Sequence, residues 1–460
     1  MRLEPWADMS PDRPMDPVRC AATAHCTVAL LVIGTRVHPA SFGSAGPGYV
    51  RLAGMRPLVQ SQKLKNVRYD VRGPILAEAQ RLEAAGHRIL KLNIGNTGPF
   101  GFTAPDAIVA DMVHNLEESQ GYSDARGIYS ARTAVAQYYQ AEGLTETGVN
   151  DIILGNGVSE LITMTLQAFL DNGNEVLIPA PDYPLWTAAV SLSGGTPVHY
   201  RCDESNGWNP DLADIESKIT PNTHGLVIIN PNNPTGAVYS REVLQGLVDL
   251  AVKYQLTIFA DEIYEKILFD DAVHHHVAAL AGNDVIVLTF SGLSKSHRVC
   301  GYRAGWVMIS GPKEVAADYL EGLHLLANMR MCANVPAQHA IQTALGGYQS
   351  IRELIVPGGR FYDQVKLASS LLNEIPGVSC VEPRGALYCF PRLDPERYPI
   401  TDDEAFVIDL LHAKKILITH GTGFNWFEPD HFRLVALPEA EVLTEAIGRI
   451  AEYLETIRRD

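Results

Sequence analysis

The chain has 460 residues with a formal net charge of −16, and 46% of its residues are hydrophobic. This length suggests two or three structural units, and the composition is that of a globular protein with a large core. The acidic balance argues against nucleic acid as a partner, and no apolar stretch approaches the ~20 residues that a membrane-spanning helix needs.

The cysteines and histidines give no sequence sign of disulfides or of a metal site. The seven cysteines are odd in number, irregularly spaced and without a CxxC pair, so we expect free thiols in a reducing cytoplasm. His274, His275 and His276 are consecutive, but they lack a second ligand cluster at zinc-like spacing. No metal is therefore expected.

The first 60 residues differ from the rest of the chain. An apolar run at residues 27–34 is flanked by Pro- and Gly-rich segments. A secretion signal is one interpretation, but the charged region before the run is weak and no clear cleavage site closes it. We expect residues 1–60 to be a disordered extension, or the result of a start codon placed too early, with Met55 as the natural start.

Regular structure is predicted from residue 61 onward. Pro74 stands where a helix begins and Gly86 follows as a stop, so residues 61–95 are expected to form a helix and a segment that packs on a smaller domain. Short apolar runs then predict a strand at residues 151–154 and a helix at residues 159–170. Four further strands are predicted at residues 175–178, 225–229, 256–260 and 285–290. Most of these runs are continuously apolar, which is typical of parallel strands buried on both faces. An α/β sandwich over residues 96–345 is therefore predicted, with ligands at the carboxyl ends of its strands.

After about residue 350 the pattern changes. Short strands are predicted at residues 378–380 and 386–390, and helices at residues 403–412 and 443–457, the last with an apolar stripe. Residues 346–460 are therefore expected to form a smaller α+β domain.

Polar residues follow several of the predicted strands. Between the first strand and its helix lies Gly-Asn-Gly-Val-Ser-Glu (residues 155–160), where bare amides and a hydroxyl suit a phosphate, although an isolated glycine turn proves little. Asn-Pro-Asn-Asn-Pro-Thr-Gly (residues 230–236) alone is a proline-rich turn, and Asp261 alone is a helix cap. Lys295 is more surprising after a buried strand, because a buried lysine is costly unless neutralised or bonded.

Together these segments resemble the class I/II aminotransferases, which are fold-type I enzymes that depend on pyridoxal 5'-phosphate. The chain carries Asn-Pro-x-Asn-Pro-Thr-Gly, Asp-x-x-Tyr and Ser-Lys-x(7)-Arg-x-Gly in the family's order. The resemblance covers about residue 60 to the C-terminus and implies a mostly parallel seven-stranded sheet sandwiched by helices. Residues 92–96, 181–186 and 421–426 bring the chain nearest to bacterial glutamate–pyruvate (alanine) aminotransferases. These enzymes transfer an amino group reversibly between L-alanine and 2-oxoglutarate.

The resemblance implies a role for each residue around the cofactor. Lys295 is expected to bind the cofactor covalently and to act as the catalytic base. Asp261 is expected to pair with the pyridine nitrogen, and Asn233 and Tyr264 to hydrogen-bond the phenolic oxygen. Tyr183 is expected to stack on the ring.

The phosphate and the partner subunit are implied in the same way. The residues expected to hold the phosphate are Val158, Ser159, Ser294 and Arg303. Tyr122 resembles a tyrosine that reaches the neighbouring subunit's phosphate, which implies a homodimer. One departure is Gly292, where many relatives carry a serine. The phosphate is therefore expected to depend more on backbone amides and Arg303.

Substrate contacts are implied at both ends of the chain. Arg433 on its own would indicate a surface ion pair, but its place in Asp-His-Phe-Arg-Leu matches the arginine that grips the α-carboxylate. Gly95 and Asn233 resemble positions that also touch this carboxylate. Tyr69 and Arg72 resemble a segment that closes over the substrate and tunes its side-chain preference.

Other functions of this fold remain open. One alternative is an aminotransferase with another donor, and a second is a carbon–sulfur lyase or decarboxylase, because the cofactor permits several reactions. A third is a transcription regulator that senses an amino acid. Such a regulator needs a DNA-binding domain, and residues 1–60 offer no helix-turn-helix and no basic stripe.

Overall fold

The computed structural model describes residues 58–67 and 73–459. The chain divides into two units, residues 1–59 and 60–460, and the architecture below is that of the second. The extension predicted for residues 1–60 lies almost wholly outside the described residues, as does Met55. Tyr69 and Arg72, expected near the substrate, lie outside them too.

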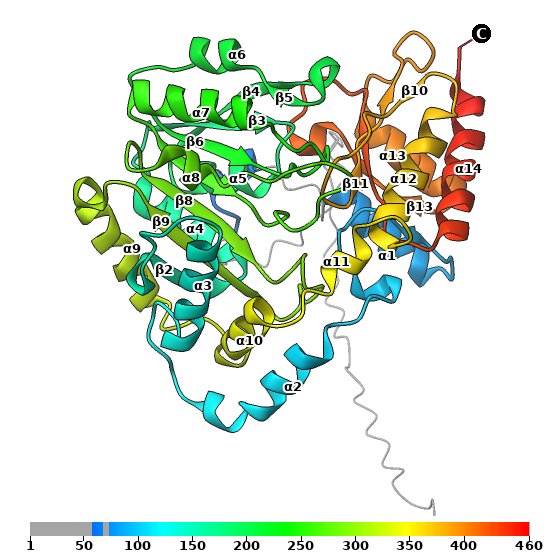
Figure 1. Ribbon diagram of the computed structural model, residues 1–460. Helices are drawn as coiled ribbons and strands as arrows, with labels where there is room; N and C mark the ends of the chain where they lie inside the picture. The colour runs from blue at the N-terminus through cyan, green and yellow to red at the C-terminus, as the bar shows by residue number, and fades with distance from the viewer. Residues whose placement is uncertain (1–57, 68–72, 460) are drawn as a thin grey trace, which may run out of the picture. The chain divides into compact units, whose positions relative to one another are not determined.

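An eight-stranded sheet forms the centre of this unit, with the strand order β2-β9-β8-β7-β6-β3-β4-β5 (Figure 1). The strands are β2 (Ile152–Asn156), β3 (Glu175–Ala180), β4 (Thr196–Asp203), β5 (Asn209–Pro210), β6 (Thr223–Ile229), β7 (Thr257–Asp261), β8 (Val287–Gly292) and β9 (Ala304–Ser310). Strands β8, β7, β6, β3 and β4 pair in parallel, whereas β9 runs antiparallel between β2 and β8. The mostly parallel sheet is thus confirmed.

The predicted count of seven strands was wrong by one. Strand β5 pairs antiparallel with β4 at the edge of the sheet through only two residue pairs. It contains Pro210 and no apolar run, so no periodicity marks it in the sequence. Strands β4 and β9 were not predicted from the sequence either. In β4, exposed and half-buried residues are mixed with buried ones, and β9 begins next to the glycine-containing motif at Arg303.

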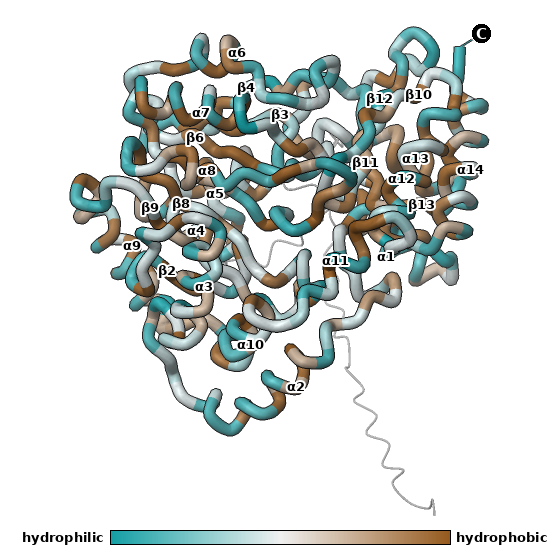
Figure 2. The backbone as a smooth tube through the Cα atoms, in the orientation of Figure 1, coloured by the Kyte–Doolittle hydropathy of each residue, from teal (hydrophilic) through white to brown (hydrophobic). Residues whose placement is uncertain are grey.

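Alternate residues of the strands face two separate cores. Leu226 and Ile228 belong to a core shared with helices α3, α7 and α10, whereas Val227 and Ile229 belong to one shared with α4, α5 and α9. The helices are α2 (Asp106–His114), α3 (Tyr129–Ala141), α4 (Val158–Phe169), α5 (Leu185–Leu192), α6 (Leu212–Ser217), α7 (Arg241–Tyr254), α8 (Val277–Ala281), α9 (Ala317–Met329), α10 (Val335–Gly346) and α11 (Ile351–Leu354). Burial on both faces explains the continuous apolar runs in the sequence. These runs are the brown stretches of the central strands in Figure 2.

A third core joins the N-terminal segment to the C-terminal part of the chain. Its helices are α1 (Pro74–Ala84), α12 (Arg360–Asn373), α13 (Asp403–Lys414) and α14 (Ala440–Ile457). Ile75, Ala79 and Leu82 of α1 share this core with the apolar side of α14, and α1 lies beside α13 (Figure 1). Strand β1 (Leu90–Lys91) pairs in parallel with β13 (Ile416–Leu417).

Short antiparallel strands complete this part. Strand β15 (Phe432–Val435) lies between β11 (Tyr388–Cys389) and β14 (Thr419–His420), and β10 (Val378–Ser379) pairs with β12 (Arg392–Leu393). Because β1 leads into Gly95 and β15 carries Arg433, this core fixes two residues that the sequence assigned to the substrate.

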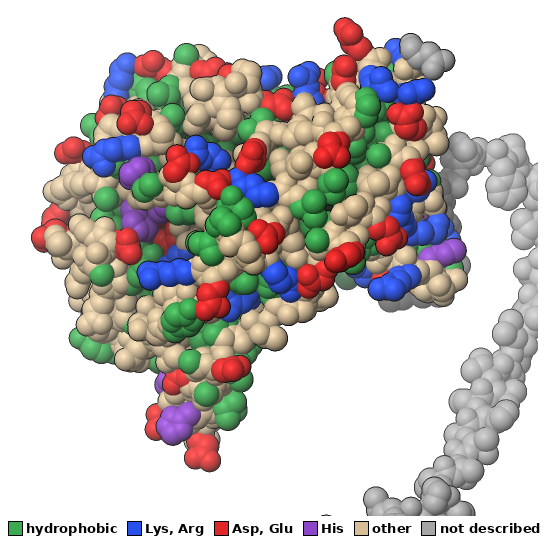
Figure 3. All heavy atoms as spheres, turned by 45° about the vertical axis from the view of Figure 1, so that its right-hand side comes forward, with side chains coloured by type: hydrophobic (Ala, Val, Ile, Leu, Met, Phe, Trp, Pro, Cys, Tyr) green, Lys and Arg blue, Asp and Glu red, His purple; other side chains and the backbone are tan. Residues whose placement is uncertain are grey.

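The surface carries both signs of charge. On the face shown in Figure 3, acidic and basic side chains of the described residues are interspersed, which is typical of a hydrated surface. Within the described residues, no helix has the length and apolar character needed to cross a membrane.

Candidate active site

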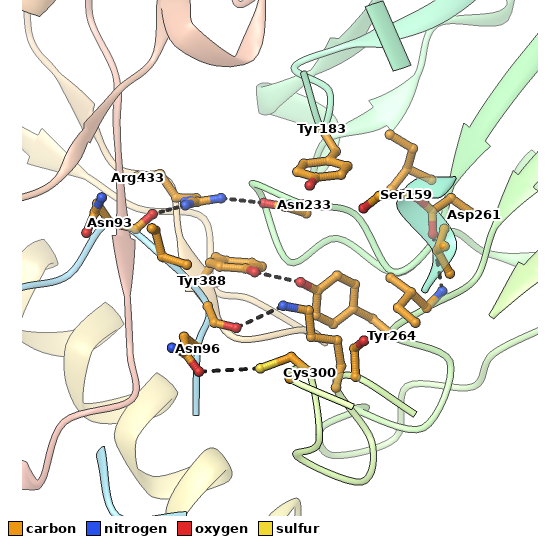
Figure 4. A pocket seen from close by; sticks show the side chains of 18 of the residues that line it. Asn93, Asn96, Ser159, Tyr183, Asn233, Asp261, Tyr264, Cys300, Tyr388 and Arg433 are labelled. Carbon is orange, nitrogen blue, oxygen red and sulfur yellow. Dashed lines mark hydrogen bonds between the residues drawn. The ribbon is translucent and has the colours of Figure 1, made fainter. Parts of the chain in front are cut away.

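A cavity of about 750 Å³ lies at the carboxyl ends of the parallel strands. It brings together most of the residues that the sequence assigned to a site (Figure 4). Those that line it are Gly95, Val158, Ser159, Tyr183, Asn233, Asp261, Tyr264, Ser294, Lys295, Arg303 and Arg433. Figure 4 shows Tyr183 and Tyr264 on opposite sides of the cavity, with Arg433 at one end and Asp261 at the other.

Lys295 presents its amine to the cavity from the loop after β8. The side chain is half-buried, and its Nζ donates a hydrogen bond of 2.8 Å to the Gly95 carbonyl oxygen. A side chain at Gly95 would not fit, because its Cβ would lie 2.3 Å from the Tyr388 hydroxyl oxygen. Glycine therefore lets the backbone approach both the amine and this phenol.

Asp261 is the last residue of β7 and is only 3% exposed. Its Oδ2 accepts a hydrogen bond of 3.1 Å from the Trp186 indole, and its Oδ1 a longer one of 3.4 Å from the Ile263 amide. Burial raises the pKa of Asp261 to about 6, although the Trp186 bond opposes the shift. The carboxylate is thus fixed in place and favours a cationic N–H donor in the cavity.

The start of α4 forms a cradle for an anion. Its N-cap residue, Gly157, has a φ of 77° and makes no side-chain cap, so the first amides of the helix depend on other acceptors. Arg303 donates to the carbonyl oxygens of Cys300 and Asn156 at 2.9 and 3.1 Å. A Cβ at Gly157 would lie 2.2 Å from the Arg303 Nη2. Glycine here supplies both the left-handed backbone and the space for the guanidinium.

The structure explains the departure at Gly292. A Cβ at this position would lie 2.7 Å from the Ala304 carbonyl oxygen and 2.9 Å from the Gly305 Cα. Strands β8 and β9 therefore approach too closely here for a serine. Ser294, which is 8% exposed, still lines the cavity.

Arg433 is buried and held in one orientation. It is 2% exposed, its Nη1 donates to Asn233 Oδ1 at 2.9 Å, and its Nη2 donates to the Asn93 carbonyl oxygen. Its Cζ lies 4.5 Å from the centre of the Tyr388 ring and 4.4 Å from that of Phe424. A planar guanidinium fixed by hydrogen bonds and aromatic rings is suited to a bidentate carboxylate.

Two phenols meet next to this arginine. The hydroxyl oxygens of Tyr264 and Tyr388 are 2.5 Å apart, and the two rings meet edge to face. Burial raises the pKa of Tyr264 well above its ordinary value, and Tyr388 adds to this effect. Tyr264 is therefore a neutral phenol that can donate or accept a hydrogen bond.

Some assignments fall elsewhere, and some site residues were missed. Tyr122 is 80% exposed and does not line the cavity of its own chain. The sequence alone indicated no role for Trp186, Tyr388 or Asn93. Trp186 stands within the family-like segment of residues 181–186 and Tyr388 within a predicted strand, and neither position alone indicates a role in the site.

Comparisons with known proteins agree on one family. Residues 88–450 match the family described as aminotransferase class I and II. The chain is 62% identical over 405 residues to an alanine aminotransferase of Mycobacterium tuberculosis, covering 88% of this chain and 94% of that protein. It is 59% identical over 400 residues to a glutamate–pyruvate aminotransferase of Escherichia coli, covering 87% and 98%. The crystal structure of an Escherichia coli aminotransferase is similar, with a TM-score of 0.87 at 58% identity, covering 88% and 100%.

Proposed function

Because the chain belongs to the class I and II aminotransferase family, we propose that it exchanges an amino group reversibly between L-alanine and 2-oxoglutarate. The products are pyruvate and L-glutamate, and one site serves both acids in a two-step, ping-pong exchange. The observation that carries this proposal is the identity of 59–62% to relatives named for these substrates over most of their length. The alternative on the same fold, a carbon–sulfur lyase, has no such support.

The cavity fits pyridoxal 5'-phosphate, which we propose as the cofactor. One cavity is lined by an amine, a buried carboxylate and an anion cradle. The amine suits the aldehyde of this cofactor, the carboxylate its ring nitrogen, and the cradle its phosphate. Lys295, Asp261 and Arg303 would hold these three parts, with the amides of Val158 and Ser159 at the phosphate. When bound, the cofactor supplies an electron sink for bonds at the substrate Cα.

We propose a separate role for each of the residues around the cofactor and the substrate. With the cofactor bound, Asp261 would keep a proton on its ring nitrogen, and Tyr264 and Asn233 would hydrogen-bond its phenolic oxygen. Lys295 would move a proton at the substrate Cα, and the hydrogen bond that its Nζ donates to the Gly95 carbonyl oxygen at the cavity supports this role. Arg433 grips the α-carboxylate of either substrate.

Side-chain selectivity is proposed to come from a lid. Burying one methyl group gives roughly 1 kcal/mol, so a preference for alanine must come from excluding larger groups. Tyr69 and Tyr183 are the residues proposed for this exclusion. Glutamate brings a second carboxylate, and Arg72 is proposed as its cation.

We also propose a homodimer in the cytoplasm. The 80% exposure of Tyr122 leaves its phenol available to a neighbouring subunit. Free thiols support a reducing compartment, and in the described part of the chain they are Cys202, Cys300, Cys332, Cys380 and Cys389.

Alanine and 2-oxoglutarate should each drive one half of the reaction. We expect L-alanine to convert the cofactor absorbance of the purified enzyme from the aldehyde form to the amine form, releasing one equivalent of pyruvate. Addition of 2-oxoglutarate should then restore the first spectrum. Release of ammonia or sulfide without this return would favour a lyase, and faster conversion by aspartate or an aromatic amino acid would overturn the alanine assignment.

Loss of the Tyr388 hydroxyl should slow both half-reactions. In Tyr388→Phe the Tyr264 hydroxyl loses its 2.5 Å partner. We expect about a tenfold loss of kcat/KM, equivalent to ~1.4 kcal/mol, which lies within the range for one hydrogen bond. Tyr362→Phe is a matched control, because its hydroxyl bonds Asp270 rather than a residue of the cavity. Equal rates in Tyr388→Phe and wild type would limit this tyrosine to packing.

A further inference from the structure

A second cluster of polar side chains lies apart from the active-site cavity. Glu262 and Glu265 follow β7, and His274 and His276 precede α8. One ligand atom from each lies within 4.8 Å of all the others, and none of the four residues lines the active-site cavity. No second ligand cluster stands near these histidines at zinc-like spacing in the sequence, and the fold brings two glutamates to them.

The distances within this cluster suit a four-coordinate metal ion. Glu262 Oε2 lies 2.6 Å from His276 Nδ1 and 3.3 Å from His274 Nε2. Glu265 Oε2 lies 3.9 Å from His276 Nδ1. Ligands bound at ~2.0–2.1 Å around a tetrahedral zinc ion are roughly 3.3 Å apart. Zinc binding would release the proton that His276 Nδ1 and Glu262 Oε2 share to the solvent, and small movements of the side chains would then give this geometry.

Two members of the cluster carry buried polar atoms that make no hydrogen bond. The His274 side chain is 6% exposed. Its Nδ1 makes no hydrogen bond, and its Nε2 lies 3.3 Å from Glu262 Oε2, an oxygen that already pairs with His276. The Glu265 side chain is 5% exposed, and its Oε2 makes none either. Buried polar atoms are usually paired, since leaving them unpaired is costly. A bound cation would satisfy both residues at once.

The other carboxylate oxygens are already held. Glu262 Oε1 accepts a hydrogen bond of 3.0 Å from the Val277 amide, and Glu265 Oε1 accepts one of 3.1 Å from the Ser291 hydroxyl. These bonds leave Oε2 of each glutamate on the side of the histidines. Such outer hydrogen bonds orient metal ligands in known sites.

We propose that Glu262, Glu265, His274 and His276 bind a divalent transition metal ion of the zinc type. Two imidazoles and two carboxylates are suitable ligands, and the two negative charges balance the cation. All four positions are taken by protein side chains, so the site is structural. The ion would tie the segment between β7 and α8 to the end of the strand that carries Asp261.

Zinc binding by the full-length holoenzyme tests this proposal. After dialysis against a chelator and then against ZnCl₂, metal analysis should find roughly one zinc ion per chain, with an increase in Tm. We expect His274→Ala to weaken binding about tenfold or more and to abolish the Tm increase. This change removes a ligand together with its 3.3 Å contact with Glu262 Oε2, and it leaves the bond between Glu262 and His276 in place. His275→Ala is the control, because His275 belongs to the same run but not to the cluster.

Three results would overturn the proposal. The first is zinc content well below one ion per chain in the wild type. The second is equal zinc binding by wild type and His274→Ala, and the third is an equal loss of binding in His274→Ala and His275→Ala; either would locate the ion elsewhere. If circular dichroism shows that His274→Ala folds poorly, zinc binding by Glu265→Gln replaces this test, since glutamine keeps the shape of the side chain and removes its charge. Weaker binding than in the wild type would support the proposal, and equal binding would overturn it.

Discussion

Replacement of Lys295 by alanine should lower turnover with L-alanine by about 10⁴-fold or more. The amine is expected both to bind the cofactor covalently and to move the proton at the substrate Cα, and a methyl group does neither. The cofactor should still bind, because Asp261 and the cradle at Gly157 remain. Single-turnover kinetics with L-alanine and the absorbance of the bound cofactor would measure the two effects separately.

A surface lysine supplies the control for this experiment. Lys253 is 61% exposed and pairs with Glu216, so Lys253→Ala should retain wild-type turnover. The Tm values of both variants would show whether either change unfolds the chain. Turnover of Lys295→Ala within tenfold of the wild type would contradict its catalytic assignment.

Replacement of Arg433 by alanine should weaken every amino-acid and 2-oxo-acid substrate by a similar amount. Loss of a buried, charge-assisted pair with the α-carboxylate should cost ~2–4 kcal/mol in kcat/KM. Arg433→Lys should not restore activity, because an ammonium cannot reproduce the planar fork held by Asn233 and the rings of Tyr388 and Phe424. Both half-reactions should be measured with alanine and with glutamate.

The pattern of losses distinguishes two roles for Arg433. A uniform loss of kcat/KM for all substrates supports binding of the α-carboxylate by Arg433. A loss confined to glutamate and 2-oxoglutarate would show that Arg433 binds their second carboxylate instead. Arg384→Ala is a suitable control, since this residue is half-exposed and pairs with Asp271 at the surface. The Tm of Arg433→Ala would separate substrate effects from loss of packing.

Five of the eight central strands (β2, β3, β6, β7 and β8) and the motifs that follow them could be predicted, because apolar runs in the local sequence mark them. Continuous apolar runs marked β6 and β7, and the motifs that follow the strands were enough to assign Asp261 and Lys295 to one site. Two glycines of the predicted site, Gly95 and Gly157, stand at positions where a Cβ would collide with Tyr388 and Arg303 respectively.

What could not be predicted depends on contacts between distant segments. Trp186 and Tyr388 look like core residues, and only the fold brings the indole to Asp261 and the phenol to Tyr264. The pairing of Glu262 with His276 requires the chain to return after 14 positions, which neither periodicity nor ligand spacing shows. Tyr69 and Arg72 stay predictions.

The joining of the first and last segments in one core has a consequence for synthesis on the ribosome. Strand β1 pairs with β13, and α1 shares its core with α14, so these contacts wait until nearly the whole chain has emerged. Strand β9 is the last strand of the large sheet in chain order, so this sheet can form earlier in synthesis. We therefore expect a nascent chain to form the anion cradle before Arg433 has been synthesised, so that the proposed cofactor site would precede the proposed substrate site.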